Sequence, residues 1–283
     1  MRCAGRCIGG SVTERVVGLL GASSLVGECL LPQLASAGWQ VSVCTRRGLP
    51  GASPEVLPHW ICVAPLWVLP DYFPLLLARG AQRVVALSST SVFTKADSSD
   101  AGEQAVAARL EEGERQLQSW AEAHGLAWVI LRPTLIYGRG RDKNVSEVAR
   151  LIRRWGFFPL LGQAEGLRQP VHAEDVAQAC VAALLAPAAT NCAYALSGGE
   201  TLTYREMVAR IFEALGKSPR PLTVPMGLFR LALKALRLLP RYRHWTPAMA
   251  QRMSEDLVFD HGAARRDLGF APRAFVLPPG DLP

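Results

Sequence analysis

Short apolar runs alternate with segments of helical spacing over the first half of the chain. Residues 15–21 form an apolar run bounded by glycine, which predicts a buried parallel strand, and residues 25–37 carry apolar side chains at helical spacing. The same patterns predict strands at 39–45, 61–64, 83–88 and 127–132 and helices at 70–79 and 102–124. This alternation is typical of an α/β protein with a doubly wound parallel sheet of the Rossmann type.

The chain is expected to divide into three parts. Residues 1–14 are predicted to be a disordered extension, residues 15–140 the Rossmann-type domain, and residues 141–283 a smaller C-terminal lobe of helices and short loops. The extension lacks the apolar stretch of a signal peptide. Elsewhere no apolar run reaches the roughly 18 residues that a membrane helix needs. We therefore expect a soluble, cytoplasmic protein.

One basic segment carries the charge imbalance of the chain. The net charge is +7, and residues 205–245 hold nine lysines and arginines against two acidic residues. Within it, Arg230, Lys234 and Arg237 are spaced to share one face of a predicted helix at 226–239. We interpret this face as solvated or as the rim of an anionic-substrate site, with membrane-surface contact as the less favoured alternative. No nucleic-acid partner is expected, because aromatic residues are not interleaved with the charges.

The seven cysteines are scattered, and no two of them form a C-x-x-C pair. This pattern predicts small buried residues with free thiols and neither a disulfide framework nor a metal site. The cysteines are Cys3, Cys7, Cys29, Cys44, Cys62, Cys180 and Cys192. His172 precedes a predicted helix at 176–185, and that position explains it better than a metal or catalytic role does. Glu174 and Asp175 suit the N-terminal dipole of the same helix.

A glycine-containing turn joins the first predicted strand to the first predicted helix. Gly21 allows the tight turn, and Gly27 allows the helix to pack closely on the strand. The start of the helix then presents backbone N–H groups to a pyrophosphate, although Ser24 stands where such loops usually have a middle glycine. We therefore expect a dinucleotide site that includes Gly21, Ser23, Ser24, Leu25, Val26 and Gly27. The alternative is an ordinary turn without a ligand.

The second predicted strand ends in two arginines, Arg46 and Arg47, where a Rossmann unit holds the adenosine ribose. An acidic residue at this place binds the ribose 2′-hydroxyl of NAD, whereas arginines pair with the 2′-phosphate of NADP. The sequence therefore favours NADP over NAD as the cofactor. The alternative is that both arginines are solvated turn residues.

Five further segments have the order and spacing of one protein family. They are SSTSVF at 88–93, LRPTLIYG at 131–138, PVHAEDVA at 170–177, YALSGG at 194–199 and LGFAP at 268–272. Over about residues 15–275 the sequence resembles the extended or atypical short-chain dehydrogenase/reductase family, the NAD-dependent epimerases and dehydratases that act on nucleotide-sugars. This resemblance implies an NAD(P) cofactor, a small-molecule substrate of the nucleotide-sugar kind, and a C-terminal lobe that binds the substrate.

The resemblance also assigns contacts to individual positions of this chain. The implied additional cofactor contacts are Ala64, Ser88 and Pro133. The implied substrate contacts are Thr90, Ser91, Arg168 and Gln169. In the family, the stretch that holds Arg168 and Gln169 lines the nucleotide-sugar site. After the second predicted strand, residues 47–60 are too few for the helix and strand usual in the family, which predicts either an open adenine side of the pocket or a shortened unit.

The proton-transfer groups of the family are only partly present. The family uses a Ser or Thr together with a Tyr and a Lys four residues apart on one helix, and the phenolate moves a hydroxyl proton while hydride passes to or from the nicotinamide. Ser89 matches the first group, but Val106 and Leu110 fall at the Tyr and Lys positions. Ser89 and Tyr137 are therefore the candidate catalytic residues, with Lys95 as a further proton donor.

Each candidate proton donor has a simpler explanation, and two other interpretations stay open. Tyr137 is better explained as a packing aromatic and Lys95 as a solvated loop residue. In one of the other interpretations, the reaction releases its proton to solvent. In the other, the protein binds a dinucleotide without turnover, as a sensor or an assembly protein.

Overall fold

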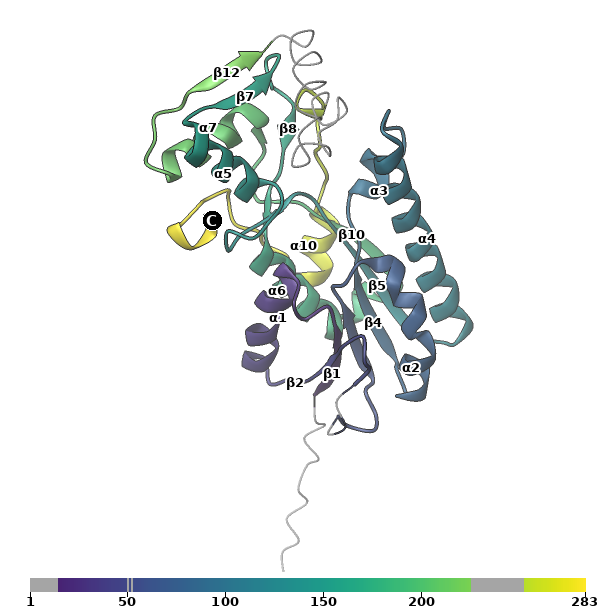
Figure 1. The fold of residues 1–283 in the computed structure, drawn as a ribbon. Helices are drawn as coiled ribbons and strands as arrows, with labels where there is room; N and C mark the ends of the chain where they lie inside the picture. Colours follow the sequence, from purple (N-terminus) through teal and green to yellow (C-terminus); the bar gives the residue numbers. More distant parts are fainter. Residues whose placement is uncertain (1–14, 50, 52, 225–251) are drawn as a thin grey trace, which may run out of the picture.

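The computed structural model describes residues 15–49, 51, 53–224 and 252–283 (Figure 1). Its centre is a six-stranded sheet in the order β10-β5-β4-β3-β1-β2, and every neighbouring pair of strands is parallel. The strands are β1 (Val16–Leu20), β2 (Gln40–Cys44), β3 (His59–Cys62), β4 (Arg83–Leu87), β5 (Ala127–Pro133) and β10 (Cys192–Leu196). The predicted Rossmann-type parallel sheet is therefore confirmed.

Helices cover both faces of this sheet, which explains why its inner strands are apolar without alternation. All five residues of β1, for example, are buried. One face packs against α1 (Leu25–Ser36), α6 (Ala173–Leu185) and α10 (Gly262–Leu268). The other face packs against the 3₁₀ helix η1 (Leu66–Tyr72), α2 (Phe73–Ala78) and α4 (Ala101–Ala123).

The strand order reverses at β1, which pairs with β2 on one side and with β3 on the other. The described part of residues 45–58, which connects β2 to β3, contains no helix. The chain is too short here to add another strand beyond β2, as the sequence predicted. In open α/β sheets, ligands bind at the carboxyl ends of the strands where the order reverses. The ends of β1 and β3 are therefore the expected place for a ligand.

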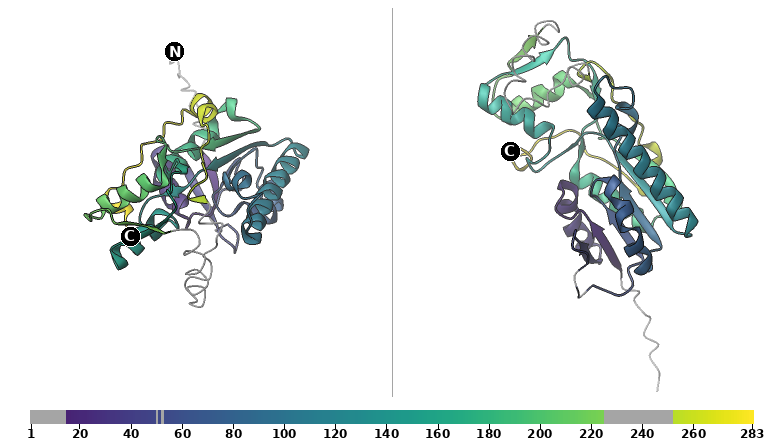
Figure 2. Two further views of the ribbon diagram at one scale, coloured as in Figure 1. Left: turned by 90° about the horizontal axis from the view of Figure 1, so that it is seen from above. Right: turned by 45° about the vertical axis from the view of Figure 1, so that its right-hand side comes forward.

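A smaller lobe lies beyond the carboxyl ends of the central strands (Figures 1 and 2). Its main elements are α5 (Val145–Trp155), β7 (Phe158–Leu161), β8 (Leu167–Arg168), β11 (Leu202–Thr203), α7 (Tyr204–Ala214) and β12 (Pro221–Val224). Short elements elsewhere are α3 (Ser91–Thr94), β6 (Ile136–Tyr137), β9 (Val171–His172), η2 (Pro187–Ala189) and η4 (Pro279–Asp281). Thr203 caps α7 in a reciprocal pair with Glu206.

The expected boundary at residue 140 does not separate the two lobes cleanly. Three elements beyond it, α6, β10 and α10, pack on the central sheet, and β10 forms its edge strand next to β5. The second lobe is therefore built from only part of residues 141–283. The expected extension at 1–14 and the basic helix at 226–239 lie outside the described residues. The described part contains no helix with the length and hydropathy of a membrane span.

Two local predictions are corrected by the structure. The segment predicted as one helix at 70–79 is instead η1 followed by α2, because Pro70 and Pro74 lack the N–H that a continuous helix needs. The strand predicted at 61–64 begins two residues earlier, at His59. Most other strands and helices of the first half begin and end within a residue or two of their predicted bounds.

The described cysteines carry free thiols. Cys29, Cys44, Cys62 and Cys180 are buried, and Cys192 is half-buried. Burial raises the pKa of both the Cys62 and the Cys180 thiol to about 12. These thiols therefore stay protonated and behave as small apolar residues, as their scattered spacing predicted.

A buried ion pair fastens α4 to the sheet. Arg132, near the end of β5, donates from Nη2 to Oε2 of Glu114 at 2.5 Å and from Nε to Oε1 at 2.9 Å. Ser88, which follows β4, donates its hydroxyl to Glu114 Oε1 at 2.5 Å. The Glu114 side chain is 7% exposed and that of Arg132 is 19% exposed. The pair therefore holds α4 and the ends of two strands in one fixed arrangement.

We expect Glu114→Gln to lower the free energy of unfolding by about 3 kcal/mol, because it leaves a mostly buried guanidinium without its countercharge. Glu112→Gln on the same helix is the matched control, since Glu112 pairs with Arg115 at the surface and such pairs contribute little. Urea unfolding of both variants measures the difference. Equal losses of stability would contradict the role given to the buried pair.

Candidate functional site

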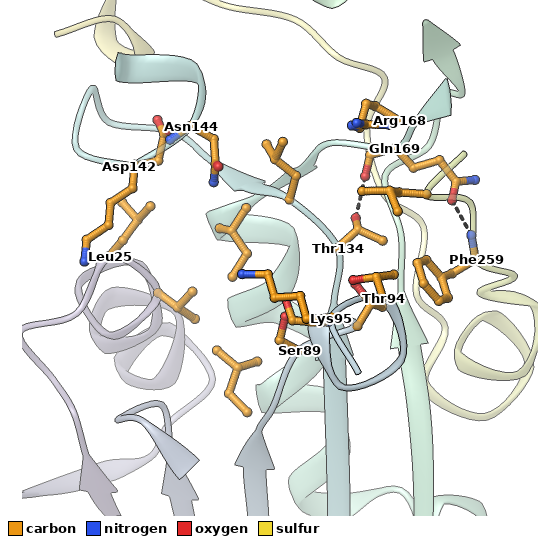
Figure 3. Close-up of a pocket in the computed structure, with 18 of the residues that line it drawn as sticks. Leu25, Ser89, Thr94, Lys95, Thr134, Asp142, Asn144, Arg168, Gln169 and Phe259 are labelled. Atoms are coloured by element: carbon orange, nitrogen blue, oxygen red, sulfur yellow. Dashed lines mark hydrogen bonds between the residues drawn. The ribbon is translucent and has the colours of Figure 1, made fainter. Parts of the chain in front are cut away.

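A pocket of about 670 Å³ opens at the carboxyl ends of the central strands, between the sheet and the second lobe (Figure 3). Its lower wall comes from the start of α1 and from the segment that follows β4. Its upper wall comes from residues 134–136, 141–144 and 168–169 and from the described segment 252–259. The pocket therefore lies where the reversal of strand order predicts a ligand.

The glycines of the loop after β1 are required by close backbone packing. Gly21 has a φ of +89°, and a Cβ there would lie 2.4 Å from the backbone nitrogen of Ala64. A Cβ on Gly27 would lie 2.4 Å from the carbonyl oxygen of Gly21. Any larger residue would force the loop away from β3 or α1. Ala64 thus bounds this loop through its backbone and does not line the pocket.

Ser24 replaces the middle glycine without strain. Its φ of −72° and ψ of 161° are open to any residue, and its hydroxyl accepts the Gly27 N–H at 3.0 Å as the N-cap of α1. The next two N–H groups, of Leu25 and Val26, have no acceptor in the described part of the chain. Leu25 and Val26 both line the pocket, whereas Ser23 is exposed outside it. The start of α1 therefore offers unpaired donors and a positive dipole end to an anion.

Arg46 and Arg47 lie in a tight turn at the end of β2. The turn is closed by two backbone hydrogen bonds between Thr45 and Gly48, of 3.0 and 2.9 Å. Both arginines are exposed, and neither guanidinium has a partner among the described residues. They do not line the pocket. At the end of β2, the structure therefore has two guanidinium groups without partners among the described residues. Both lie outside the pocket that Ser89 lines.

The polar residues after β4 divide into supporting and pocket-facing groups. Ser88 is buried against Glu114, and Thr90 donates its N–H and its hydroxyl to the Pro133 carbonyl at 3.1 and 3.2 Å. Ser88 and Pro133 do not line the pocket, whereas Ser89, Thr90 and Ser91 do. The Ser89 hydroxyl accepts the Ser91 N–H at 3.1 Å. Its own proton has no acceptor in the described residues, so it is free to donate to a ligand.

Arg168 and Gln169 line the pocket, but their polar groups are bonded to the protein itself. Arg168 donates to the Leu167 and Glu255 carbonyls at 2.7 and 2.8 Å and also to the Arg252 carbonyl. Burial lowers the pKa of Arg168. Gln169 donates to Thr201 Oγ1 at 3.1 Å and accepts the Phe259 N–H at 2.7 Å. Both side chains thus hold the segment 252–259 as a wall of the pocket (Figure 3).

Tyr137 is buried away from the pocket. It is fully inaccessible to solvent and packs edge-on against His172 and Phe275. Its hydroxyl donates to the Ala274 carbonyl at 3.5 Å, and burial raises its pKa to about 12. The candidate catalytic role of Tyr137 is therefore not supported by its position, which is that of a packing aromatic.

The helix that carries Tyr and Lys in the family presents neither group here. Val106 is half-buried, and Leu110 is 5% exposed in the hydrophobic core beneath α4. Neither residue lines the pocket. Lys95 does line it, which corrects the interpretation of this residue as a solvated loop lysine. Burial is the main cause that lowers the pKa of Lys95, and the charge of Arg252 adds to it.

Several pocket residues had no signal in the sequence. They are Thr94, Arg141, Asp142, Lys143, Asn144, Arg252 and Phe259. Two of them are held by ion pairs between distant segments, Arg141 with Glu28 on α1 and Arg252 with Glu103 on α4. These residues are brought together by the packing of the second lobe, which no local pattern encodes.

Comparison with known proteins finds similarity to one family over the middle of the chain. The model of the NAD dependent epimerase/dehydratase family matches residues 73–196. UDP-glucose 4-epimerase of Vibrio cholerae is 29% identical over 120 residues, which cover 42% of this chain and 37% of that protein. 2-alkyl-3-oxoalkanoate reductase of Stenotrophomonas maltophilia (strain K279a) is 30% identical over 161 residues, which cover 53% and 48%. The matched region thus spans half or less of the length of each relative.

The fold is shared with solved structures over almost the whole chain. MoeE5, solved in complex with UDP-glucose and NAD, gives a TM-score of 0.65 at 20% identity, over 93% of this chain and 94% of that chain. Over residues 73–196 the chain is therefore similar to the NAD dependent epimerase/dehydratase family, which agrees with the resemblance of its sequence to the extended or atypical short-chain dehydrogenases/reductases.

Proposed function

We propose that the protein binds NADP(H) and transfers hydride between the nicotinamide and a small anionic substrate. This proposal rests on one observation. A single pocket is lined both by the start of α1 and by Ser89, which follows the end of β4. A pyrophosphate would bind the N–H groups of Leu25 and Val26, which have no acceptor among the described residues. The nicotinamide of the same cofactor would then extend along the strand ends toward Ser89. The residues present therefore fit a dinucleotide, whose nicotinamide would supply or accept the hydride.

The preference for NADP rests on the turn after β2. Arg46 and Arg47 are exposed and unpaired within the described chain, and the described part of this turn contains no acidic residue that would bind a ribose 2′-hydroxyl. Guanidinium groups bind phosphate through paired charge-assisted hydrogen bonds. An NADP 2′-phosphate at this turn would neutralise two charges that the protein otherwise leaves free.

The charge around the pocket supports an anionic substrate. The basic side chains that line it are Lys95, Arg141, Lys143, Arg168 and Arg252, and the acidic one is Asp142. Positive charge in a cleft concentrates anionic ligands. MoeE5 was solved with UDP-glucose, and the Vibrio cholerae relative is a UDP-glucose epimerase. A nucleotide-sugar is therefore the substrate class that we propose.

A second candidate function is dinucleotide binding without turnover, as a sensor or an assembly protein. It is favoured by Val106 and Leu110, which put apolar side chains at the two proton-transfer positions of the family. Incubation with NADP⁺ and a panel of nucleotide-sugars separates the candidates. NADPH fluorescence reports net oxidation of a sugar, and chromatography of the products reports an epimerisation that regenerates the cofactor. Binding without any product favours the second candidate.

We expect the double substitution Arg46→Ala/Arg47→Ala to weaken NADPH binding about tenfold to a hundredfold and to leave NADH binding nearly unchanged. Hydrogen bonds to charged groups contribute about 1.5–3 kcal/mol, and about 1.4 kcal/mol corresponds to tenfold in affinity. Fluorescence titration with both dinucleotides measures the change.

The control for this experiment is Arg153→Ala/Arg154→Ala, a second pair of adjacent exposed arginines, which lies on α5 in the other lobe. The control pair should leave both affinities unchanged. An equal loss of NADPH and NADH binding on removing Arg46 and Arg47 would contradict the 2′-phosphate assignment.

We expect Gly27→Ala to abolish measurable binding of NADPH and NADH alike. The added Cβ meets the Gly21 carbonyl, so the loop moves and the N–H groups at the start of α1 lose their direction. Gly280→Ala is the control, because a Cβ there meets nothing within 4 Å. Dinucleotide titration, with circular dichroism to verify folding, provides the measurement. A folded Gly27→Ala protein that binds NADPH normally would place the cofactor elsewhere.

A further inference from the structure

The pocket contains few groups that are able to exchange a proton. Its arginines stay charged. Asp142 accepts three hydrogen bonds from Asn144 and Ser146 at the start of α5, so its carboxylate oxygens are already bonded to the protein. Burial raises the pKa of Tyr204 to about 12. Among the described residues, this leaves the amines of Lys95 and Lys143.

The two lysines occupy different parts of the pocket. Lys143 is exposed at the rim, beside Asn144. Lys95 is half-buried at the end of α3, where its backbone N–H bonds to the Ser91 carbonyl at 3.1 Å. Its amine has no hydrogen-bond or ion-pair partner among the described residues. Figure 3 shows its side chain directed into the cavity close to Ser89.

The surroundings of Lys95 make its ammonium easier to deprotonate. Burial is the largest cause that lowers its pKa, and the positive charge of Arg252 acts in the same direction. Glu103 and Asp100, at the start of α4, oppose this shift. Glu103 is paired with Arg252, and Asp100 caps α4 through the Glu103 N–H, so neither carboxylate bonds to the lysine. An amine that loses its proton more readily is better suited to acid–base work near neutral pH.

We propose that Lys95 is the acid–base residue of the site, taking the place of the missing Tyr and Lys on α4. The inference rests on the proposed function and identifies the group that handles the proton in that reaction. Lys95 reaches the pocket from the loop after β4, beside Ser89, whereas the family positions on α4 are apolar and do not line the pocket. The acid–base role has therefore moved from α4 to the segment between β4 and α4 that carries Lys95.

In the oxidation of a substrate alcohol, Lys95 takes up the hydroxyl proton. The C–H bond breaks and its hydride passes to the nicotinamide of NADP⁺, while the O–H bond breaks and its proton passes to the neutral Lys95 amine. The products are a ketone, NADPH and the Lys95 ammonium, which returns its proton to solvent. Reduction of a ketone runs in the reverse direction. Ser89 holds the reacting oxygen by donating its free hydroxyl proton to it.

The first test compares Lys95→Met and Lys95→Arg with wild type, using NADP⁺ and UDP-glucose as the probe. Both variants should bind NADPH as wild type does, and both should lose about 100-fold to 10,000-fold in kcat with a smaller change in KM. Lys95→Arg keeps the charge but cannot release a proton, so it separates proton transfer from charge attraction. Lys217→Met is the control and should keep its kcat, because Lys217 lies outside the pocket, where its amine donates to the Ile152 and Arg153 carbonyls. A Lys95→Arg enzyme with wild-type kcat overturns the proposal.

The second test needs no substrate. It therefore tests the role of Lys95 even if the protein does not turn over UDP-glucose. Acetylation of Lys95 and Lys143 by acetic anhydride is followed by peptide mass spectrometry across a range of pH. Lys95 should become reactive at lower pH than Lys143, and bound NADPH should protect it. Equal pH dependence, or no protection by NADPH, overturns the role of Lys95 while leaving the proposed function standing. Failure of wild type to bind NADPH would instead overturn the proposed function.

Discussion

The close approach of β1, β3 and the first turn of α1 is the constraint on which the site depends. A Cβ on Gly18 would lie 2.4 Å from the Trp60 ring, and one on Gly27 would lie 2.4 Å from the Gly21 carbonyl. Helix α1 therefore begins directly at the strand ends, where Leu25 and Val26 line the pocket and their N–H groups have no acceptor among the described residues. Ser24 fits because only the outer glycines make these contacts. Steric packing, more than any polar contact, fixes the position of this helix start.

The sheet and its flanking helices could be predicted because their signals are local. The glycine turn predicted the start of α1, and the apolar runs predicted the strands from β1 to β5. The return of α6, β10 and α10 to the sheet could not be predicted, because edge-strand pairing depends on contacts distant in sequence. A boundary drawn where the strand–helix alternation stops therefore divides the chain in the wrong place.

The candidate site was predicted best where backbone geometry determines it and least well where side chains do. Ser89 reaches the pocket as expected, whereas Tyr137 follows a strand end of the same kind and points into the core of the second lobe. Arg168 and Gln169 lie in the pocket wall, but their polar groups hold the segment 252–259. Sequence position predicts that a residue is near a site. It does not predict whether neighbouring segments already occupy its hydrogen bonds.

The buried pair between Glu114 and Arg132 explains why a change of acid–base group is structurally feasible. It fixes α4 against β5 and the Ser88 strand end, independently of the residues at 106 and 110. Those two positions are therefore free to become apolar without moving the loop that carries Ser89. Because the same loop continues into α3, a lysine at its end shares the rigid support of Ser89. The backbone of this loop is held by the bonds of the Thr94 and Lys95 N–H groups to the Thr90 and Ser91 carbonyls, so a proton donor here starts from a fixed backbone beside Ser89.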